Sequence, residues 1–245
     1  METCFYGFHA IEELLKRTDV RGVLKYSKNN SRIRTLIELA KNRDVKLERA
    51  SDRELDVISG SVKHRGVILI VQDLGDRKNL SFRTTLQLLK QKSDALVLIL
   101  DGITDPHNLG AILRSADQFG VDLVVIPSRR SVKDTPTVSR ISAGADVYVS
   151  ISVVQNIPNA IEELKENNFW VYGADMSGEE LFRVDLKGRC AIVMGREGEG
   201  LHRLVRNRCD RILSIPNMGH IDSLNVSVAT GIFLYEIRRQ QLTLN

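Results

Sequence analysis

Short apolar runs alternate with helical stretches along the second part of the chain. Residues 95–100 form one continuous apolar run, and a helix is expected at 110–119, after a loop at 103–109. Further strands are expected at 121–126, 147–151, 169–174, 191–194 and 211–215, and further helices at 157–166, 200–206 and 225–240. Continuous apolar runs suit strands that are buried on both faces. The alternation therefore predicts an α/β domain with a mostly parallel sheet covered by helices on both sides.

The front of the chain has a pattern of its own. Helices are expected at 10–16, 32–41 and 52–58, and strands at 23–26, 45–47 and 66–71. Polar residues follow at 73–79, and a helical stretch at 84–92 leads into the second part. We therefore expect a small α/β domain over residues 1–73, a linker with a lead-in helix over 74–92, and a second domain over 93–245.

Charge is distributed unevenly between these two parts. Residues 1–92 carry 19 Lys and Arg against 12 Asp and Glu, whereas residues 93–245 carry 16 against 19. A basic front domain suggests a polyanionic partner, although a solvated charged surface would have the same composition. The basic residues from which we expect contacts with such a partner are Lys28, Arg32, Arg34 and Arg65.

Composition also indicates which cellular compartment the protein occupies and whether a metal site is expected. No apolar run is long enough to span a membrane, and the start of the chain has no leader-like pattern. Cys4, Cys190 and Cys209 are far apart, and the histidines are scattered, so neither a metal site nor a disulfide framework is indicated. These features favour a cytoplasmic protein without a metal.

Three polar clusters follow expected strands, where open α/β sheets bind ligands. The first, residues 101–114, reads DGITDPHNLGAILR and contains Asn108 and Arg114. Taken alone, Asn108 is explained as a helix cap and Arg114 as a surface side chain. The second, residues 192–201, reads IVMGREGEGL and contains Glu197 among three glycines, which predict tight turns close to a ligand. Its spacing matches neither a dinucleotide-binding nor a Walker loop.

The third cluster, residues 215–229, reads IPNMGHIDSLNVSVA. Ser223 and Asn225 stand where an apolar helix begins. A helix cap explains one of these polar residues, but not both together with Pro216 and Gly219.

The three clusters, in this order, resemble the three motifs of the SpoU/TrmH family of RNA ribose methyltransferases in the SPOUT superfamily. The resemblance covers about residues 94–243. The sequences YGFHA at residues 6–10 and HRGV at 64–67 resemble the extra N-terminal domain of one branch, which is similar to ribosomal large-subunit proteins that bind RNA. That branch acts on a guanosine of 23S rRNA. The resemblance implies a trefoil-knotted α/β catalytic domain behind an RNA-binding domain.

The resemblance also implies the cofactor, the reaction and the site. S-adenosylmethionine would donate a methyl group to a ribose 2′-hydroxyl of RNA. The residues carried over as catalytic are Asn108, Arg114, Glu197, Ser223 and Asn225. Those expected to bind the cofactor are Gly195, Ile215, Met218, Leu224 and Asn225. Arg114 would either accept the hydroxyl proton or stabilise the forming alkoxide, and the sequence leaves both roles open.

Two other functions compete with this hypothesis. A tRNA guanosine 2′-O-methyltransferase would use the same catalytic domain, but the front domain favours large-subunit rRNA. A non-catalytic RNA-binding or ribosome-assembly protein would need the basic front domain, but not all five catalytic candidates. Incorporation of methyl groups into RNA distinguishes an enzyme from a binder.

The C-terminal stretch predicts self-association. Residues 226–240 are apolar over more than one helical stripe, and the polar face is weak before Arg238. A helix buried within one subunit would also show this pattern. Members of the resembled family pair through this region, so we expect a homodimer.

Overall fold

The computed structural model describes residues 3–60, 64–73, 81–128, 149–220 and 223–242. These residues form two compact units, one within 3–73 and the other within 81–242. Residues 74–80, the first part of the expected linker and lead-in helix at 74–92, lie outside the described residues, so the domain boundaries stay a prediction. Within the described ranges, no helix has both the length and the apolar character that crossing a membrane requires.

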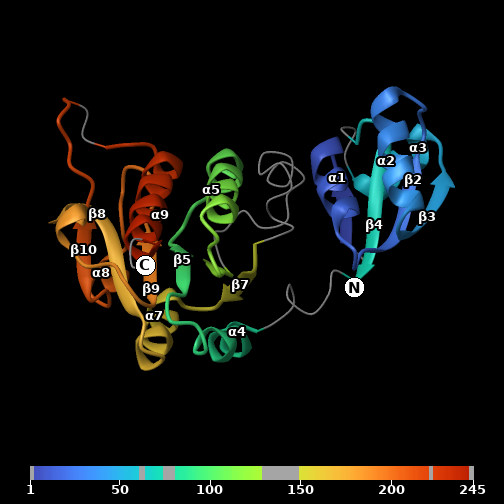
Figure 1. The fold of residues 1–245 in the computed structure, drawn as a ribbon. Coiled ribbons are helices and arrows are strands. Elements are labelled where there is room, and N and C mark those ends of the chain that lie inside the picture. Colours follow the sequence, from blue (N-terminus) through green and yellow to red (C-terminus); the bar gives the residue numbers. More distant parts are fainter. Residues whose placement is uncertain (1–2, 61–63, 74–80, 129–148, 221–222, 243–245) are drawn as a thin grey trace. The chain divides into compact units, whose positions relative to one another are not determined.

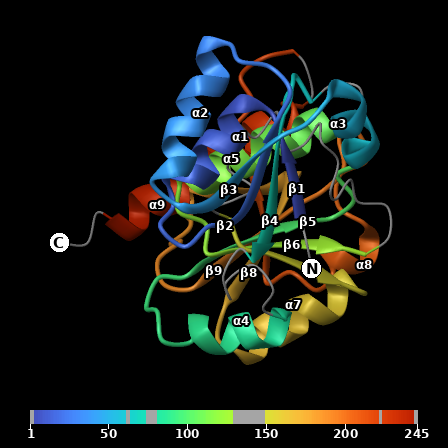
Figure 2. The ribbon, with the colours of Figure 1, turned by 90° about the vertical axis from the view of Figure 1, so that its right-hand side faces the viewer.

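The front unit is a four-stranded sheet with helices against it (Figures 1 and 2). Its strand order is β1-β4-β2-β3, and only the β2–β3 pair is parallel. The strands are β1 (Thr3–Tyr6), β2 (Arg21–Tyr26), β3 (Asp44–Arg49) and β4 (Val67–Asp73), and the helices are α1 (Phe8–Lys16), α2 (Ser31–Lys41) and α3 (Asp52–Ser59). Buried apolar side chains of α1 and α2 pack on the strands and form the core of this unit.

The second unit contains the parallel sheet that the sequence predicts. Six strands lie in the order β10-β8-β9-β5-β6-β7, and every pair is parallel. The strands are β5 (Leu96–Leu100), β6 (Leu123–Pro127), β7 (Ile151–Val154), β8 (Trp170–Glu180), β9 (Cys190–Met194) and β10 (Arg211–Ser214). Because all strands run the same way, their carboxyl ends meet at one edge.

Helices cover both faces of this sheet, as Figures 1 and 2 show. Ala95, Val97 and Ile99 face a core shared with α4 (Phe82–Leu89), α7 (Ile157–Glu166) and α8 (Arg203–Arg206). The longer helices α5 (Pro106–Gln118) and α9 (Val226–Leu242) pack against each other on the opposite side. A short 3₁₀ helix, η3 (Leu181–Arg183), follows β8.

Several element boundaries differ from the expected ones. Helix α5 begins at Pro106 rather than near residue 110, because Asp105 caps it and proline suits the first helical position. Strand β8 extends to Glu180, and the expected strand at 147–151 begins at Ile151 within the described residues. The edge strand β1 was not predicted.

Helix α9 buries four of the eight apolar residues that suggested a dimer. Its buried residues are Val226, Thr230, Phe233, Leu234, Ile237 and Gln241. Val228 and Tyr235 remain exposed, at 51% and 56%. Burial within the chain therefore accounts for much of this apolar pattern, and the homodimer stays a prediction.

Candidate functional site

The carboxyl edge of the parallel sheet brings together three segments that are distant in sequence. The first is the amino end of α5, after β5. The second is the loop of residues 195–201, after β9, which we call the glycine loop. The third consists of residues 215–220 and 223–225, between β10 and α9. These segments hold the three polar clusters that the sequence analysis singled out.

Asn108, Glu197 and Asn225 form a closed three-way contact between these segments. The Nδ2 group of Asn108 donates to Glu197 Oε2 at 3.2 Å. The Nδ2 group of Asn225 donates to Glu197 Oε1 at 3.2 Å and to Asn108 Oδ1 at 3.0 Å. Each carboxylate oxygen of Glu197 thus accepts from one amide, so the three side chains hold a single arrangement.

Helix ends fix the two amides. Asn225 Oδ1 accepts from the backbone N–H of Ser227 at 2.9 Å, which caps α9 and turns the amide nitrogen toward Glu197. Asn108 is the third residue of α5, and its backbone N–H donates to the cap Asp105 at 2.9 Å. The Glu197 carboxylate therefore lies at the amino ends of two helices, where the helix dipoles favour a negative charge.

The glycine loop is closed by its own backbone. Arg196 and Gly200 exchange two backbone hydrogen bonds of 2.9 Å, so Glu197 projects from the tip of a tight turn. Gly198 and Gly200 have φ of 79° and 69°. A Cβ at Gly195 would lie 2.3 Å from the backbone carbon and oxygen of Gly200, so only glycine fits there.

The residues expected to bind S-adenosylmethionine have the character that this ligand needs. Its adenine ring requires an apolar surface, and Met218 and Leu224 are 96% and 49% exposed. Ile215 directly follows β10, and Gly195 directly follows β9. The contact between Glu197 and Asn225 joins these two segments. The residues therefore fit the cofactor, and their individual roles remain predictions.

Arg114 and Ser223 lie on the same two segments but outside the three-way contact. Arg114 is exposed on α5, about 9 Å along the axis from Asn108 and about 120° around it, from standard helix geometry. Ser223 is exposed two residues before Asn225. The structure thus joins three of the five catalytic candidates directly.

The four basic candidates of the front unit are all exposed. Ser27 donates its backbone N–H to Gly66 O at 3.0 Å, and the Lys28 side chain passes close to Gly66, so Lys28 lies next to the turn that holds Arg65. Lys28 Nζ also lies 3.5 Å from Asp52 Oδ2. On α2, Arg32 stacks over the Phe8 ring at 5.7 Å, and Arg34 Nε donates to Asn29 at 3.1 Å.

Arg65 has an unusual backbone conformation, with a φ of 57°. The preceding His64 is buried, and its Nδ1 accepts from the Gly66 N–H at 2.9 Å. Because Nδ1 is the acceptor, Nε2 is the nitrogen that can donate, and it lies 3.0 Å from Asp56 Oδ1. These contacts hold the turn so that the Arg65 guanidinium stands in solvent.

Two of the cysteines are unsuited to chemistry. Burial raises the pKa of the Cys190 and Cys209 thiols to about 12, so neither forms a thiolate near neutral pH. Across the described ranges, no group of three His, Cys, Asp or Glu residues is arranged to hold a metal ion.

Two family models match the chain. Residues 95–235 match the SpoU rRNA Methylase family, and residues 4–75 match the RNA 2′-O ribose methyltransferase substrate binding domain. The two matches fall on the two units of the structure.

Curated and solved proteins are similar over nearly the whole chain. The 23S rRNA (guanosine-2'-O-)-methyltransferase RlmB of Coxiella burnetii is 43% identical over 241 residues, covering 96% of this chain and 95% of the relative. A solved RNA 2′-O ribose methyltransferase superposes with a TM-score of 0.75 at 25% identity, covering 98% and 89% of the two chains. The SpoU methyltransferase AviRb of Streptomyces viridochromogenes, solved with AdoMet, has a TM-score of 0.77 at 23% identity, covering 99% and 91%. The expected fold class is confirmed.

Proposed function

Because this chain belongs to the SpoU rRNA Methylase family, we propose that it transfers a methyl group from S-adenosylmethionine to a ribose 2′-hydroxyl of RNA. We further propose that the substrate is a guanosine of 23S rRNA, as for the relatives of this length. The observation that carries the proposal is the contact among Asn108, Glu197 and Asn225, which unites the three motif segments at one edge of the sheet. The thiols of the chain suit the reducing cytoplasm, where we place this activity.

The chain would act mainly by positioning the reactants. The bound cofactor supplies a methyl group that is already activated by a sulfonium. Main chain at Gly195, Ile215 and Leu224 would hold the cofactor, with Met218 against its apolar part. The three-way contact would orient the ribose, and Ser223 would complete the polar wall. Correct placement of the reactants alone removes several kcal/mol from a barrier.

Arg114 would act on the attacking oxygen. An alcohol is a weak nucleophile, so charge that develops on the 2′-oxygen must be stabilised. An arginine stays protonated in proteins, so we assign it the role of a cation that stabilises the forming alkoxide. An RNA phosphate or water would then take the proton.

Methyl incorporation tests the proposed function. Purified protein with methyl-labelled S-adenosylmethionine should label 23S rRNA that lacks the modification, and mapping should place the label on one guanosine ribose. Label in tRNA alone would support the tRNA alternative. Tight RNA binding with no label would support the non-catalytic alternative.

We propose that Lys28 and Arg65 form an RNA phosphate site in the front unit. A non-glycine residue with a left-handed backbone costs about 1 kcal/mol or more, and such strain gathers at functional positions. Here the strained residue carries an exposed guanidinium, on a turn that the Lys28 side chain also contacts. Arg32 and Arg34 would add contacts from α2.

Arg65→Gly should weaken RNA binding without weakening the fold. Glycine adopts the same backbone conformation without strain, so thermal stability should stay equal or rise. The loss of one phosphate contact should reduce the slope of log Kd against log salt by about one. Lys41→Ala, at the other end of α2, removes an equal charge and should leave the slope unchanged. Equal slopes for wild type and Arg65→Gly would exclude this phosphate contact.

We also propose that the working unit is a homodimer in which α9 takes part. Phe233 and Ile237 are unsuitable for testing this, because both are buried within the chain. Val228 is exposed on the same helix, so Val228→Glu should give the sedimentation mass of one chain while the folding transition persists. Val57→Glu, the same change at an exposed valine on α3, should keep the dimer mass. A wild-type protein with the mass of one chain at micromolar concentration would contradict the dimer.

A further inference from the structure

A buried carboxylate stands at the end of β5, and the proposed mechanism gives it no role. The Asp101 side chain is 8% exposed. Its Oδ2 accepts from the backbone N–H of His202 at 3.2 Å and lies 2.9 Å from His202 Nδ1. Residue 202 directly follows the glycine loop. The Asp101 carboxylate, from the first motif, therefore binds the residue that follows the glycine loop of the second motif.

The neighbouring residue contacts the other end of the same loop. Gly102 has a φ of 87°, and a Cβ there would lie 2.6 Å from Arg196 Nε. The Arg196 side chain thus passes directly over Gly102, while its Nη1 pairs with Glu199 at 3.0 Å. Within the described part of the chain, Nε of Arg196 is buried without a hydrogen-bond partner. Close packing of the Arg196 side chain on Gly102, rather than a hydrogen bond, therefore fixes the position of the start of the glycine loop.

These two contacts enclose the residue that completes the three-way contact. Between Arg196 and His202 the backbone closes on itself through the Arg196–Gly200 pair. Glu197 lies in that closed turn and reaches Asn108 and Asn225 with contacts of 3.2 Å. A tight turn held at both ends moves as one piece, so a shift at its exit is carried to the Glu197 carboxylate.

We propose that Asp101 is a positioning residue for methyl transfer. It fixes the end of the glycine loop through His202, and the loop then holds Glu197 against the two amides. Asp101 acts through the loop and does not touch the reacting atoms. This inference rests on the proposed function, because it takes the Glu197 contact to be part of the catalytic site.

A matched control exists at the opposite edge of the same sheet. Asp122 precedes β6 and is also largely buried, with a side chain that is 10% exposed. Its Oδ2 accepts from the backbone N–H of Leu96 at 2.8 Å. Asp122→Ala therefore removes a comparable carboxylate-to-backbone bond far from the glycine loop. A purely structural role for Asp101 predicts that both variants behave alike.

The first measurement is amide hydrogen exchange of the full chain, which needs no activity. Asp101→Ala should raise the exchange rates of the Arg196 and Gly200 amides by about tenfold or more, because local opening of the loop becomes easier. Asp101→Asn keeps an oxygen that can accept from His202 and should restore most of the protection. Asp122→Ala should leave these two amides unchanged. Unchanged exchange in Asp101→Ala would overturn the proposal, even if RNA methylation were never observed.

The second measurement is a double-mutant cycle in turnover. Asp101→Ala should lower kcat by about thirtyfold with a small change in KM, since misplacement of a catalytic group by about 1 Å has effects of this order. In a Glu197→Gln background, Asp101→Ala should lower kcat by about threefold or less. The Glu197 carboxylate that Asp101 positions is already absent there, so the two substitutions disrupt the same arrangement. Equal losses in the two backgrounds would overturn the coupling through Glu197.

Two further outcomes are informative. If Asp101→Ala does not fold, His202→Ala takes its place, because it removes only the contact between the imidazole ring and Asp101. His202→Ala should still raise the exchange rate of the Gly200 amide. An unchanged exchange rate at Gly200 would overturn the proposal. A wild-type protein that methylates no RNA would instead refute the proposed function and leave the exchange test standing.

Discussion

Arg114→Ala is expected to lower the turnover of RNA 2′-O-methylation by about a thousandfold, roughly 4 kcal/mol in the barrier. The alanine variant retains the proposed cofactor residues, which lie on other segments, so affinity for S-adenosylmethionine should stay close to wild type. Arg114 is exposed on α5, so its removal leaves no cavity in the core. The loss should therefore appear in kcat, measured by methyl incorporation, and not in the folding transition.

Two further variants show whether the guanidinium itself is required. Arg114→Lys should also fail, because a compact ammonium cannot reproduce the planar fork of donors. Gln118→Ala changes another exposed residue one turn along α5 and should keep full activity. Retention of more than about a tenth of wild-type turnover by Arg114→Ala, a change of roughly 1.4 kcal/mol, would remove Arg114 from its central role.

The regular parts of this fold follow from local sequence patterns. The parallel sheet could be predicted because residues 95–100 and 191–194 are continuously apolar, as buried strands are. Helix α7 was predicted with its observed bounds, because its apolar spacing is clear and Asn156 caps it. The start of α5 was placed too late, although Asp105 and Pro106 are a normal start signal.

The missed elements depend on partners that are distant in sequence. Strand β1 has only four residues and exists as the antiparallel neighbour of β4. The polar end of β8, up to Glu180, pairs with Leu213 and Ser214 of β10, after a shift in register. Residues 174–180 show no periodicity that would indicate this extension. The extension depends instead on pairing with the neighbouring strand.

The site was predicted by resemblance, and the structure adds how its parts meet. Sequence motifs identified Asn108, Glu197 and Asn225 as candidates, but they could not show that each oxygen of Glu197 accepts from one amide. Asp101 opens the first polar cluster but was not named as a site candidate, and His202 was in none of the clusters. They are separated by 101 positions, and neither lies in a periodic pattern that marks a contact.

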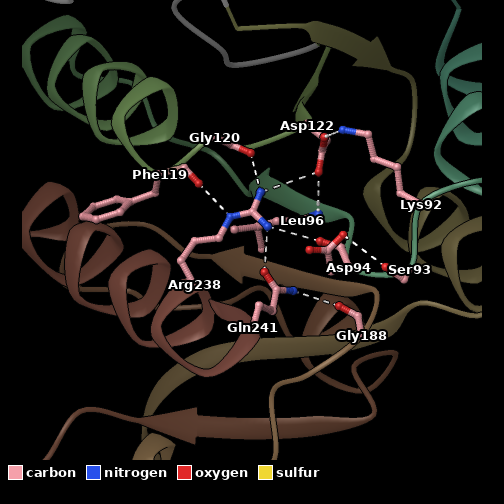
Figure 3. Close-up of polar contacts among 10 residues, drawn as sticks. All are labelled: Lys92, Ser93, Asp94, Leu96, Phe119, Gly120, Asp122, Gly188, Arg238 and Gln241. Atoms are coloured by element: carbon pink, nitrogen blue, oxygen red, sulfur yellow. Dashed lines mark hydrogen bonds and ion pairs between the residues drawn. The ribbon is translucent and has the colours of Figure 1, made fainter. Parts of the chain in front are cut away.

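Arg238→Ala is expected to cause a large loss of stability without a direct effect on chemistry. Figure 3 shows the Arg238 guanidinium among backbone oxygens at the amino ends of β5 and β6. Nε donates to Phe119 O at 2.7 Å, and Nη1 donates to Asp94 O at 3.1 Å and to Gln241 Oε1 at 2.7 Å. Nη2 donates to Gly120 O and lies 3.7 Å from Asp122 Oδ2. The group thus ties the end of α9 to two strand-connecting segments.

The expected cost is about 3 kcal/mol, because the Arg238 side chain, only 17% exposed, takes its hydrogen bonds with it, and Asp122, only 10% exposed, loses a cation. Lys92 still pairs with Asp122, which keeps the cost below that of a fully unpaired carboxylate. For a chain of this size the melting temperature should fall by roughly 6–12 °C. Arg238→Lys should recover little, since one ammonium cannot reach acceptors that lie around a planar fork.

The adjacent residue provides the control for Arg238. Arg239 lies on the same turn of α9, and its side chain, which is 48% exposed, pairs with Glu236 at 2.7 Å. Arg239→Ala makes the same change in helix propensity and net charge, but it should cost much less stability, because a solvent-exposed guanidinium contributes little through an ion pair. Thermal unfolding of both variants at one pH and protein concentration compares them directly. Equal shifts in melting temperature would mean that the Arg238 guanidinium contributes no more stability than a surface ion pair. Packing of α9 alone would then hold the end of this helix against the segments that precede β5 and β6.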